Sequence, residues 1–295
     1  MSLGYACINI SLQEKGIYST RSMIKKTFLE KGIQYASQIA LSNITGLLKI
    51  LKWNAKHGIK VFRVSSDLFP WASEYKLESL PDFTAIRKLL EEAGKQPVRM
   101  STHPGPFNKL ASSGLALTRT IRELDIHGEV FDLMGLPQTH LHKINIHVGG
   151  AYGNKEETAK RFGENFRLLS QSVQKRLTVE NDDKPGLYSV KELLPIHQSI
   201  GIPIVFDYFH HKLHPGGLTE EEAFLAAYNT WGVKPIFHYS SSRRSTEDEK
   251  AKKEAHSDWV HEKINTYGKD IDIVLETKMK ELSVIKYRDE FGNMN

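Results

Sequence analysis

The chain has 295 residues, of which 40% are hydrophobic and 25% are charged, and this composition with a net charge of +5 is typical of a globular protein with a mild preference for polyanionic partners. No run approaches the roughly 18 consecutive apolar residues of a membrane-spanning helix, and the first residues lack the basic and apolar regions of a signal peptide, so we expect neither membrane insertion nor secretion. The single cysteine, Cys7, can form no internal disulfide, which favours a reducing compartment, either the cytoplasm or, in a eukaryote, the nucleus.

Short apolar runs rich in β-forming residues recur along the chain, and segments with the helical period separate most of them. The runs cover residues 3–10, 60–65, 97–103, 143–149, 176–181, 203–207, 234–240 and 270–276. Continuous apolar strands that alternate with helices indicate parallel strands buried on both faces. We therefore predict that residues 1–295 form one domain with the (β/α)8 TIM-barrel fold. An open doubly wound sheet is the alternative, but no G-x-G-x-x-G motif follows the first run.

Capping signals mark several of the helices between these runs. Ser189 with Glu192, and Thr219 with Glu222, have the spacing of a capping box before an apolar segment. Residues 43–58 carry an apolar stripe with helical spacing that ends at a glycine. These signals place helices where the barrel needs them.

Imidazoles and carboxylates stand at or just after the ends of the predicted strands. Chemistry in a TIM barrel lies at the C-terminal ends of the strands, so these side chains should share one rim. Taken singly, each is more often a helix cap or a solvated loop residue, but together they would remain unpaired at that rim without cations. The candidate ligands are Asp67, His103, His147, Glu180, Asp207, His210, His238, His256 and Glu276.

The number and type of these donors predict two or three divalent metal ions. Imidazoles and carboxylates without a thiolate favour Mn²⁺, with Zn²⁺ or Mg²⁺ as alternatives. Centres with several such ions activate water and stabilise both the attacking and the leaving oxygen in phosphodiester cleavage.

The motifs at the strand ends resemble those of the ultraviolet damage endonuclease family, in order and across nearly the whole chain. The matching segments are LGYACIN, SSDLFPWAS, STHPG, NIHVGGAYGNKEET, LTVENDD, VFDYFHHKLHPG, FHYSS and VLETKMKE. The resemblance implies a metal-dependent TIM barrel similar to endonuclease IV. It also implies a DNA repair enzyme that hydrolyses the phosphodiester immediately 5′ to ultraviolet photoproducts, and to some abasic sites, in duplex DNA.

The resemblance also assigns roles to single residues. It implies that the candidate ligands hold metal, with Glu180 and Glu276 as bridging ligands and Asp67 at a position where some relatives have histidine. Glu180, Asp207 and Glu276 would form the catalytic centre, and Lys278 would neutralise the scissile phosphate. Two further imidazoles, His211 and His214, would lie near DNA phosphate or be solvated.

Other residues are candidates for contact with DNA. Tyr5 and Asn9 match family positions near the substrate pocket, although Tyr5 could equally be a packing residue. Arg243 and Arg244 lie in a long polar loop with His256, where they would either contact phosphate or form a solvated face.

Two departures from the family pattern bear on function. Pro106 and Phe107 stand where the family often has Gln-Tyr, and we expect Phe107 to act as a stacking wedge at the lesion unless it packs against the rim. Ile236 stands two positions before His238, where some relatives carry a lysine, so a modified lysine at that position can have no role here.

Two other functions remain open at this level. A metal-dependent sugar isomerase or epimerase of the xylose-isomerase type would share the barrel and the metals but would need fewer ligands. A catalytically inactive binder of damaged DNA would not need the full ligand set. We expect a monomer that acts on duplex DNA and has no membrane partner.

Overall fold

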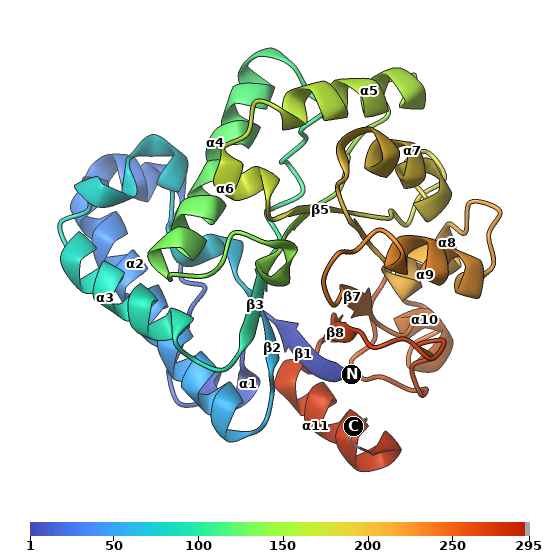
Figure 1. Ribbon diagram of the computed structural model, residues 1–295. Helices are drawn as coiled ribbons and strands as arrows, with labels where there is room; N and C mark the ends of the chain where they lie inside the picture. The colour runs from blue at the N-terminus through green and yellow to red at the C-terminus, as the bar shows by residue number, and fades with distance from the viewer. Residues whose placement is uncertain (293–295) are drawn as a thin grey trace.

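The computed structural model describes residues 1–292 and shows one eight-stranded parallel sheet that curves into a barrel (Figure 1). The strand order in the sheet is β6-β5-β4-β3-β2-β1-β8-β7. The TIM-barrel prediction is confirmed, and each predicted run contains one strand or most of one. The strands are β1 (Ser2–Ala6), β2 (Val61–Val64), β3 (Arg99–Thr102), β4 (Ile144–Ile146), β5 (Leu177–Glu180), β6 (Ile204–Val205), β7 (Ile236–Tyr239) and β8 (Asp272–Leu275).

The barrel closes at the predicted metal ligands. β6 and β7 are the two edges of the sheet, and a single parallel bridge joins Asp207 to His238 between them. The His238 backbone N–H donates to the carbonyl of Phe206 at 3.0 Å. Two candidate ligands are therefore brought together by the last backbone contact that completes the barrel.

Helices cover the outside of the barrel (Figure 1). They are α1 (Ile10–Gln13), α2 (Lys25–Lys56), α3 (Phe83–Gly94), α4 (Gly114–Leu133), α5 (Lys155–Phe166), α6 (Gln171–Gln174), α7 (Val190–Ile200), α8 (Tyr208–Leu213), α9 (Glu220–Tyr228), α10 (Arg243–Thr246) and α11 (Lys280–Phe291). Short 3-10 turns, η1 (Ser66–Leu68), η2 (Ala72–Glu74), η3 (Leu77–Ser79) and η4 (His140–His142), lie in the connections.

The predicted helix signals hold, with one difference in length. Both capping boxes are formed, at Ser189 with Glu192 before α7 and at Thr219 with Glu222 before α9. The helix expected over residues 43–58 begins much earlier, at Lys25, and is kinked at Gly32. The seventh unit has only the short α10, and the segment after it, which carries His256, has no further helix before β8.

Alternation along the strands builds the site. Side chains of successive strand residues point to opposite faces, so residues two apart share a face. A small apolar cluster inside the barrel contains Ala6, Val61, Ile236 and Val274. Two residues further along β2, β7 and the end of β8, the same face carries Arg63, His238 and Glu276. An apolar layer thus lies directly beneath a polar one, and the departure at Ile236 belongs to the apolar layer.

Within residues 1–292, every helix is too short or too polar to cross a membrane.

Candidate metal centre

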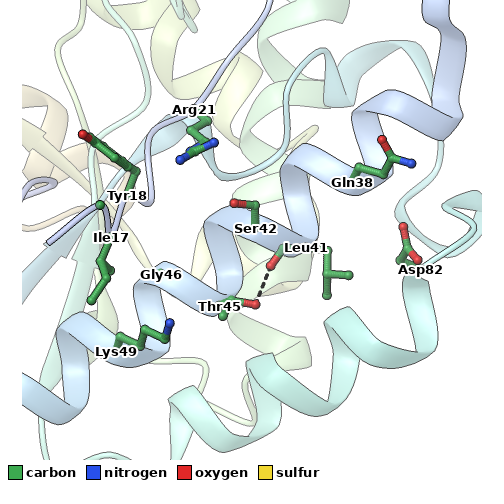
Figure 2. A pocket seen from close by; sticks show the side chains of 11 residues that line it. Ile17, Tyr18, Arg21, Gln38, Leu41, Ser42, Thr45, Gly46, Lys49 and Asp82 are labelled. Carbon is green, nitrogen blue, oxygen red and sulfur yellow. Dashed lines mark hydrogen bonds between the residues drawn. The ribbon is translucent and has the colours of Figure 1, made fainter. Parts of the chain in front are cut away.

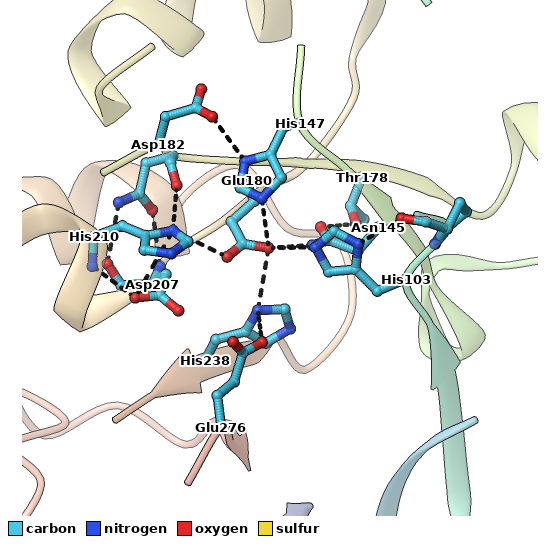
Figure 3. Close-up of polar contacts among 12 residues, drawn as sticks. His103, Asn145, His147, Thr178, Glu180, Asp182, Asp207, His210, His238 and Glu276 are labelled. Carbon is cyan, nitrogen blue, oxygen red and sulfur yellow. Dashed lines mark hydrogen bonds and ion pairs between the residues drawn. The ribbon is translucent and has the colours of Figure 1, made fainter. Parts of the chain in front are cut away.

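Six of the nine predicted ligands form two groups that share one carboxylate. His103, His147 and Glu180 form the first group, and Glu180 with Asp207, His238 and Glu276 forms the second. Within each group the ligand atoms lie within 4.8 Å of one another. Figure 3 shows the imidazoles from several strands directed at the Glu180 carboxylate. We call these six residues the ligand cluster.

Glu180 lies at the middle of the ligand cluster. Its Oε2 is 3.2 Å from His103 Nε2 and 3.1 Å from His238 Nδ1, and it accepts a hydrogen bond from the Asn145 amide. Burial opposes ionisation of this carboxyl, but the imidazoles of His238 and His147 hold its pKa well below the usual range. Glu180 is therefore an ionised, buried carboxylate with ligand groups on several sides.

The first two imidazoles are oriented by acceptors behind them. His103 Nδ1 lies 3.1 Å from the Pro104 carbonyl, and His147 Nδ1 lies 3.0 Å from Asp182 Oδ1. An acceptor at one ring nitrogen leaves the other free for a metal, and this arrangement is usual for metal-binding histidines. The Nε2 atoms of His103 and His147 accordingly face Glu180, at 3.2 and 4.0 Å.

His238 is oriented in the opposite sense. Its Nε2 lies 3.0 Å from the buried Nζ of Lys143, while its Nδ1 faces Glu180 and lies 3.2 Å from Glu276 Oε1. Burial lowers the pKa of His238 to about 4 and that of Lys143 to about 7. His238 is therefore neutral near pH 7, which is the form that binds metals.

Glu276 is paired with a cation inside the barrel. The Arg63 guanidinium, from β2, contacts Glu276 Oε1, while Oε2 lies 3.9 Å from His256 Nδ1. Burial opposes ionisation of Glu276, but Arg63 holds the pKa of this carboxyl well below its usual range. Arg63 thereby fixes one oxygen of Glu276 and leaves the second directed toward the imidazole.

Several buried polar atoms at this centre lack a hydrogen-bond partner. They include Asp207 Oδ2 and His256 Nδ1. His147 Nδ1 and His238 Nδ1 also lack an aligned hydrogen bond, although carboxylate oxygens lie 3.0 and 3.1 Å from them. Asp207 uses its other oxygen to accept the His210 backbone N–H at 2.8 Å, and burial raises the pKa of its carboxyl to about 7. Buried polar groups without a partner are rare and call for a ligand. The donor set is made of oxygen and imidazole nitrogen, so divalent cations such as Mn²⁺ or Zn²⁺ fit it.

The other three predicted ligands lie outside the two groups. His210 Nδ1 is 3.3 Å from Glu180 Oε1 and also 2.9 Å from the Asn181 carbonyl. His256 Nδ1 is 3.9 Å from Glu276 Oε2, and the His210 and His256 rings are 6.4 Å apart, so both imidazoles border the cluster. Asp67 is exposed at the rim and belongs to neither group.

The predicted DNA-contacting residues differ in exposure. Phe107 is 90% exposed, which excludes the alternative that it packs against the rim, and Pro106 is also exposed. Phe107 borders a cavity of about 700 Å³ that is also lined by Asp67, Trp71 and Arg119.

The cationic candidates follow β7 and β8 and lie at the C-terminal end of the barrel, as the ligand cluster does. Arg243 is partly exposed and lies 3.4 Å from Asp258, and Arg244 is exposed. Lys278 is exposed, and its backbone N–H donates to the Ser257 carbonyl beside His256.

Four residues for which the sequence suggested a place near the substrate are buried within the protein. Tyr5 is fully buried and its hydroxyl donates to Asn54 at 2.7 Å, while the Asn9 amide donates to Tyr5 and its oxygen caps α1. The expectation that His211 and His214 face DNA phosphate or solvent is wrong, because both are buried. His211 packs against Phe206, with ring centroids 5.4 Å apart.

Sequence reasoning missed the residues that orient the ligands. Arg63, Lys143, Asn145 and Asp182 were not singled out, yet each contacts a member of the ligand cluster. The signal for Arg63 was its position two residues after Val61, because alternate residues of this strand point into the barrel. Lys143 gave no signal, because a lysine just before a strand is usually solvated.

Comparisons with known proteins agree with this geometry. The UV-endonuclease UvdE family matches residues 1–295. A UV-damage endonuclease of Schizosaccharomyces pombe is 35% identical over 96% of this chain, and the chain spans 49% of its length. A putative UV-damage endonuclease of Acanthamoeba polyphaga mimivirus is 30% identical, over 96% of this chain and 89% of that protein. A UV DNA damage endonuclease of Bacillus cereus is 33% identical, over 85% and 81% of the two chains.

Solved structures give the same result for the fold. The crystal structure of SacUVDE matches with a TM-score of 0.85 and 32% identity over all of both chains. Endonuclease IV from Thermus thermophilus matches with a TM-score of 0.58 and 14% identity, over 98% of each chain. D-psicose 3-epimerase from Clostridium cellulolyticum matches with a TM-score of 0.57 and 10% identity, over 100% and 93%. At these low identities the last two share only the fold, so the sugar isomerase alternative is not favoured.

Proposed function

This chain belongs to the UV-endonuclease UvdE family, and on that premise we propose that it is a metal-dependent endonuclease that cleaves duplex DNA at ultraviolet lesions. We further propose that it hydrolyses the phosphodiester immediately 5′ to the photoproduct, that it also acts at some abasic sites, and that it works as a monomer. The observation that carries the proposal is the pair of ligand groups joined by Glu180 at the C-terminal rim of the barrel.

The residues of the ligand cluster would hold two ions, and His210 with His256 offers donors for a third. Mn²⁺ is the proposed metal, because the donors are imidazole nitrogen and carboxylate oxygen. When bound, such ions lower the pKa of water and stabilise the charge that develops on the phosphate oxygens.

The chain's own side chains prepare this site. Glu180 is ionised and fixed by Asn145, so it can serve both ligand groups as a bridge. Arg63 holds one oxygen of Glu276, and Lys143 holds one nitrogen of His238, so each ligand presents its remaining donor atom to the centre. Preorganised ligands need no rearrangement during the reaction.

Exposed residues around the centre would bind the duplex. Lys278 is exposed beside His256, where its ammonium group would neutralise the scissile phosphate. Arg243 and Arg244 would contact the backbone, and the exposed ring of Phe107 would stack on bases at the distorted lesion.

Incubation with ultraviolet-irradiated plasmid tests this function. We expect Mn²⁺-loaded protein to convert irradiated supercoiled plasmid to the nicked form and to leave unirradiated plasmid intact. A duplex with one defined photoproduct, labelled at its 5′ end, should give a fragment that ends immediately 5′ to the lesion. Equal nicking of irradiated and unirradiated plasmid, or no nicking of either, would contradict the proposal.

A further inference from the structure

The loop after β4 contains an exposed aromatic ring in an unfavourable backbone conformation. Tyr152 is 55% exposed and has φ of 46°, in the left-handed region that disfavours residues with a side chain. Its neighbours Gly149 and Gly153 also have positive φ, which glycine adopts without strain. Strained residues of this kind persist where the surrounding structure enforces them, and they cluster at functional sites.

This loop is packed against the loop that carries Phe107. Gly149 has φ of 93°, and a Cβ atom there would lie 2.9 Å from Lys109 Cγ, so glycine favours the close approach of the two loops. Arg161 Nε, on α5, donates to the carbonyl of Ala111 at 2.6 Å and ties α5 to the Phe107 loop. The Arg161 guanidinium also lies 5.2 Å from the centre of the Tyr152 ring and supports it. The two loops therefore form one unit with two exposed rings.

The two loops also begin at neighbouring ligands. Phe107 lies four residues after His103, and Tyr152 lies five residues after His147. These two histidines belong to the same ligand group, and their rings are 5.4 Å apart. Phe107 and Tyr152 therefore lie in two loops that each begin at a histidine of the same ligand group.

We propose that Tyr152 is a second base-stacking residue, which contacts a nucleobase of the lesion-containing duplex together with Phe107. This inference rests on the proposed function, because it assumes a DNA substrate. An aromatic face stacks on any base, and the arginine behind Tyr152 leaves the exposed part of the ring for that contact. The strained backbone holds the ring outward before DNA arrives, so little ordering is required on binding.

Single-turnover nicking of a duplex with one photoproduct tests the inference, with the rate followed as a function of protein concentration. Tyr152→Ala should raise the half-saturating protein concentration by about tenfold or more, which is the range for the loss of one stacked base. Its metal content and melting temperature should match the wild type, because Tyr152 is exposed and contacts no ligand. Tyr152→Phe retains the ring and should stay within about twofold of the wild type.

Tyr18 provides a matched control. It is also exposed, by 37%, and the Arg21 guanidinium lies 5.0 Å from its ring, beside a cavity of about 340 Å³ on the side of α2 (Figure 2). Tyr18→Ala should leave the half-saturating concentration unchanged. A Tyr152→Ala variant that nicks like the wild type, or a Tyr152→Phe variant as weak as Tyr152→Ala, would overturn the stacking role alone. Failure of the wild type to nick lesion DNA would overturn both the proposed function and the inference that rests on it.

Discussion

Each end of the barrel has a largely buried ion pair between an arginine and a carboxylate. Arg99 pairs with Asp272, the first residue of β8, and Arg63 pairs with Glu276, the residue directly after β8. At the N-terminal end, Arg99 Nη1 lies 3.0 Å from Asp272 Oδ2. The remaining Arg99 nitrogens donate to the carbonyls of Leu141 and Lys234, both at 2.7 Å, and Asp272 accepts the Ser2 backbone N–H at 3.0 Å. This pair is therefore fully satisfied by the protein itself.

The pair at the C-terminal end is not satisfied in this way. Arg63 contacts Glu276, but its Nε has no partner, and neither do His238 Nδ1 and Asp207 Oδ2. Both pairs are largely buried, so burial alone does not distinguish them. The unpaired atoms do distinguish them: the N-terminal pair is a structural closure, and the C-terminal pair borders donor atoms that bound cations would satisfy.

The largest effect is expected from the shared ligand. Glu180→Gln keeps the size of the side chain but removes the charge that both ligand groups use, so metal affinity and nicking should fall by about a hundredfold or more. Elemental analysis and the plasmid assay measure the two effects. As a control, Glu192→Gln removes a capping-box carboxylate of α7 that pairs with Ser189 and Lys155 and not with the ligand cluster, and it should lower only the melting temperature. Normal metal content in Glu180→Gln would show that Glu180 is not a bridging ligand.

Replacing each of the two arginines with Met tests the comparison between the two ends directly. Arg63→Met should lower the affinity for Mn²⁺ by about tenfold to a hundredfold, because it removes the group that orients Glu276. Arg99→Met should leave that affinity unchanged and lower the free energy of unfolding by about 3 kcal/mol, because it leaves a buried carboxylate with fewer partners. Calorimetric titration and denaturant unfolding separate the two. Equal losses of metal affinity in both variants would mean that the two ends are not different in kind.

The affinity of the ligand cluster for metal should depend on pH, because His147 must be neutral to bind a metal ion. Burial opposes the charge on His147, but the Glu180 and Asp182 carboxylates outweigh it and raise the pKa of this imidazole to about 9. Below that pH the imidazole is protonated in the metal-free protein and must release its proton before it binds metal. Affinity for Mn²⁺ should therefore fall by about tenfold per pH unit as the pH is lowered from 9 to 7, and more steeply below pH 7, where the Asp207 carboxyl also takes up a proton. An affinity that is constant over this range would argue against His147 as a ligand.

The smallest effect is expected on the salt dependence of DNA binding, when surface cations at the two ends of the barrel are replaced. Replacing both Arg243 and Arg244 with Ala should flatten the slope of log affinity against log salt by about two units, because two phosphate contacts are lost. The matched control replaces Lys56 and Lys95, which are exposed at the C-terminal ends of α2 and α3, and should leave the slope unchanged. If both double variants changed the slope equally, neither pair would contact DNA specifically.

The fold was largely predictable, because each strand is a compact apolar run and helix caps use local signals. The ligand cluster followed from the barrel rule, which brings strand ends such as His103, Glu180 and Glu276 to one rim. What the sequence did not show were contacts set by side-chain reach and burial. Lys143 reaches His238 from the residue before β4, and His211 turns into the core although its neighbour His210 borders the metal centre.

Electron paramagnetic resonance of the Mn²⁺-loaded protein tests the central claim most directly. If Glu180 joins two ligand groups, protein with two equivalents of Mn²⁺ should show the multiline spectrum of a magnetically coupled pair, and Glu180→Gln should lose it. A spectrum of isolated Mn²⁺ ions in the wild type, or binding of a single ion, would contradict a centre built on a shared carboxylate.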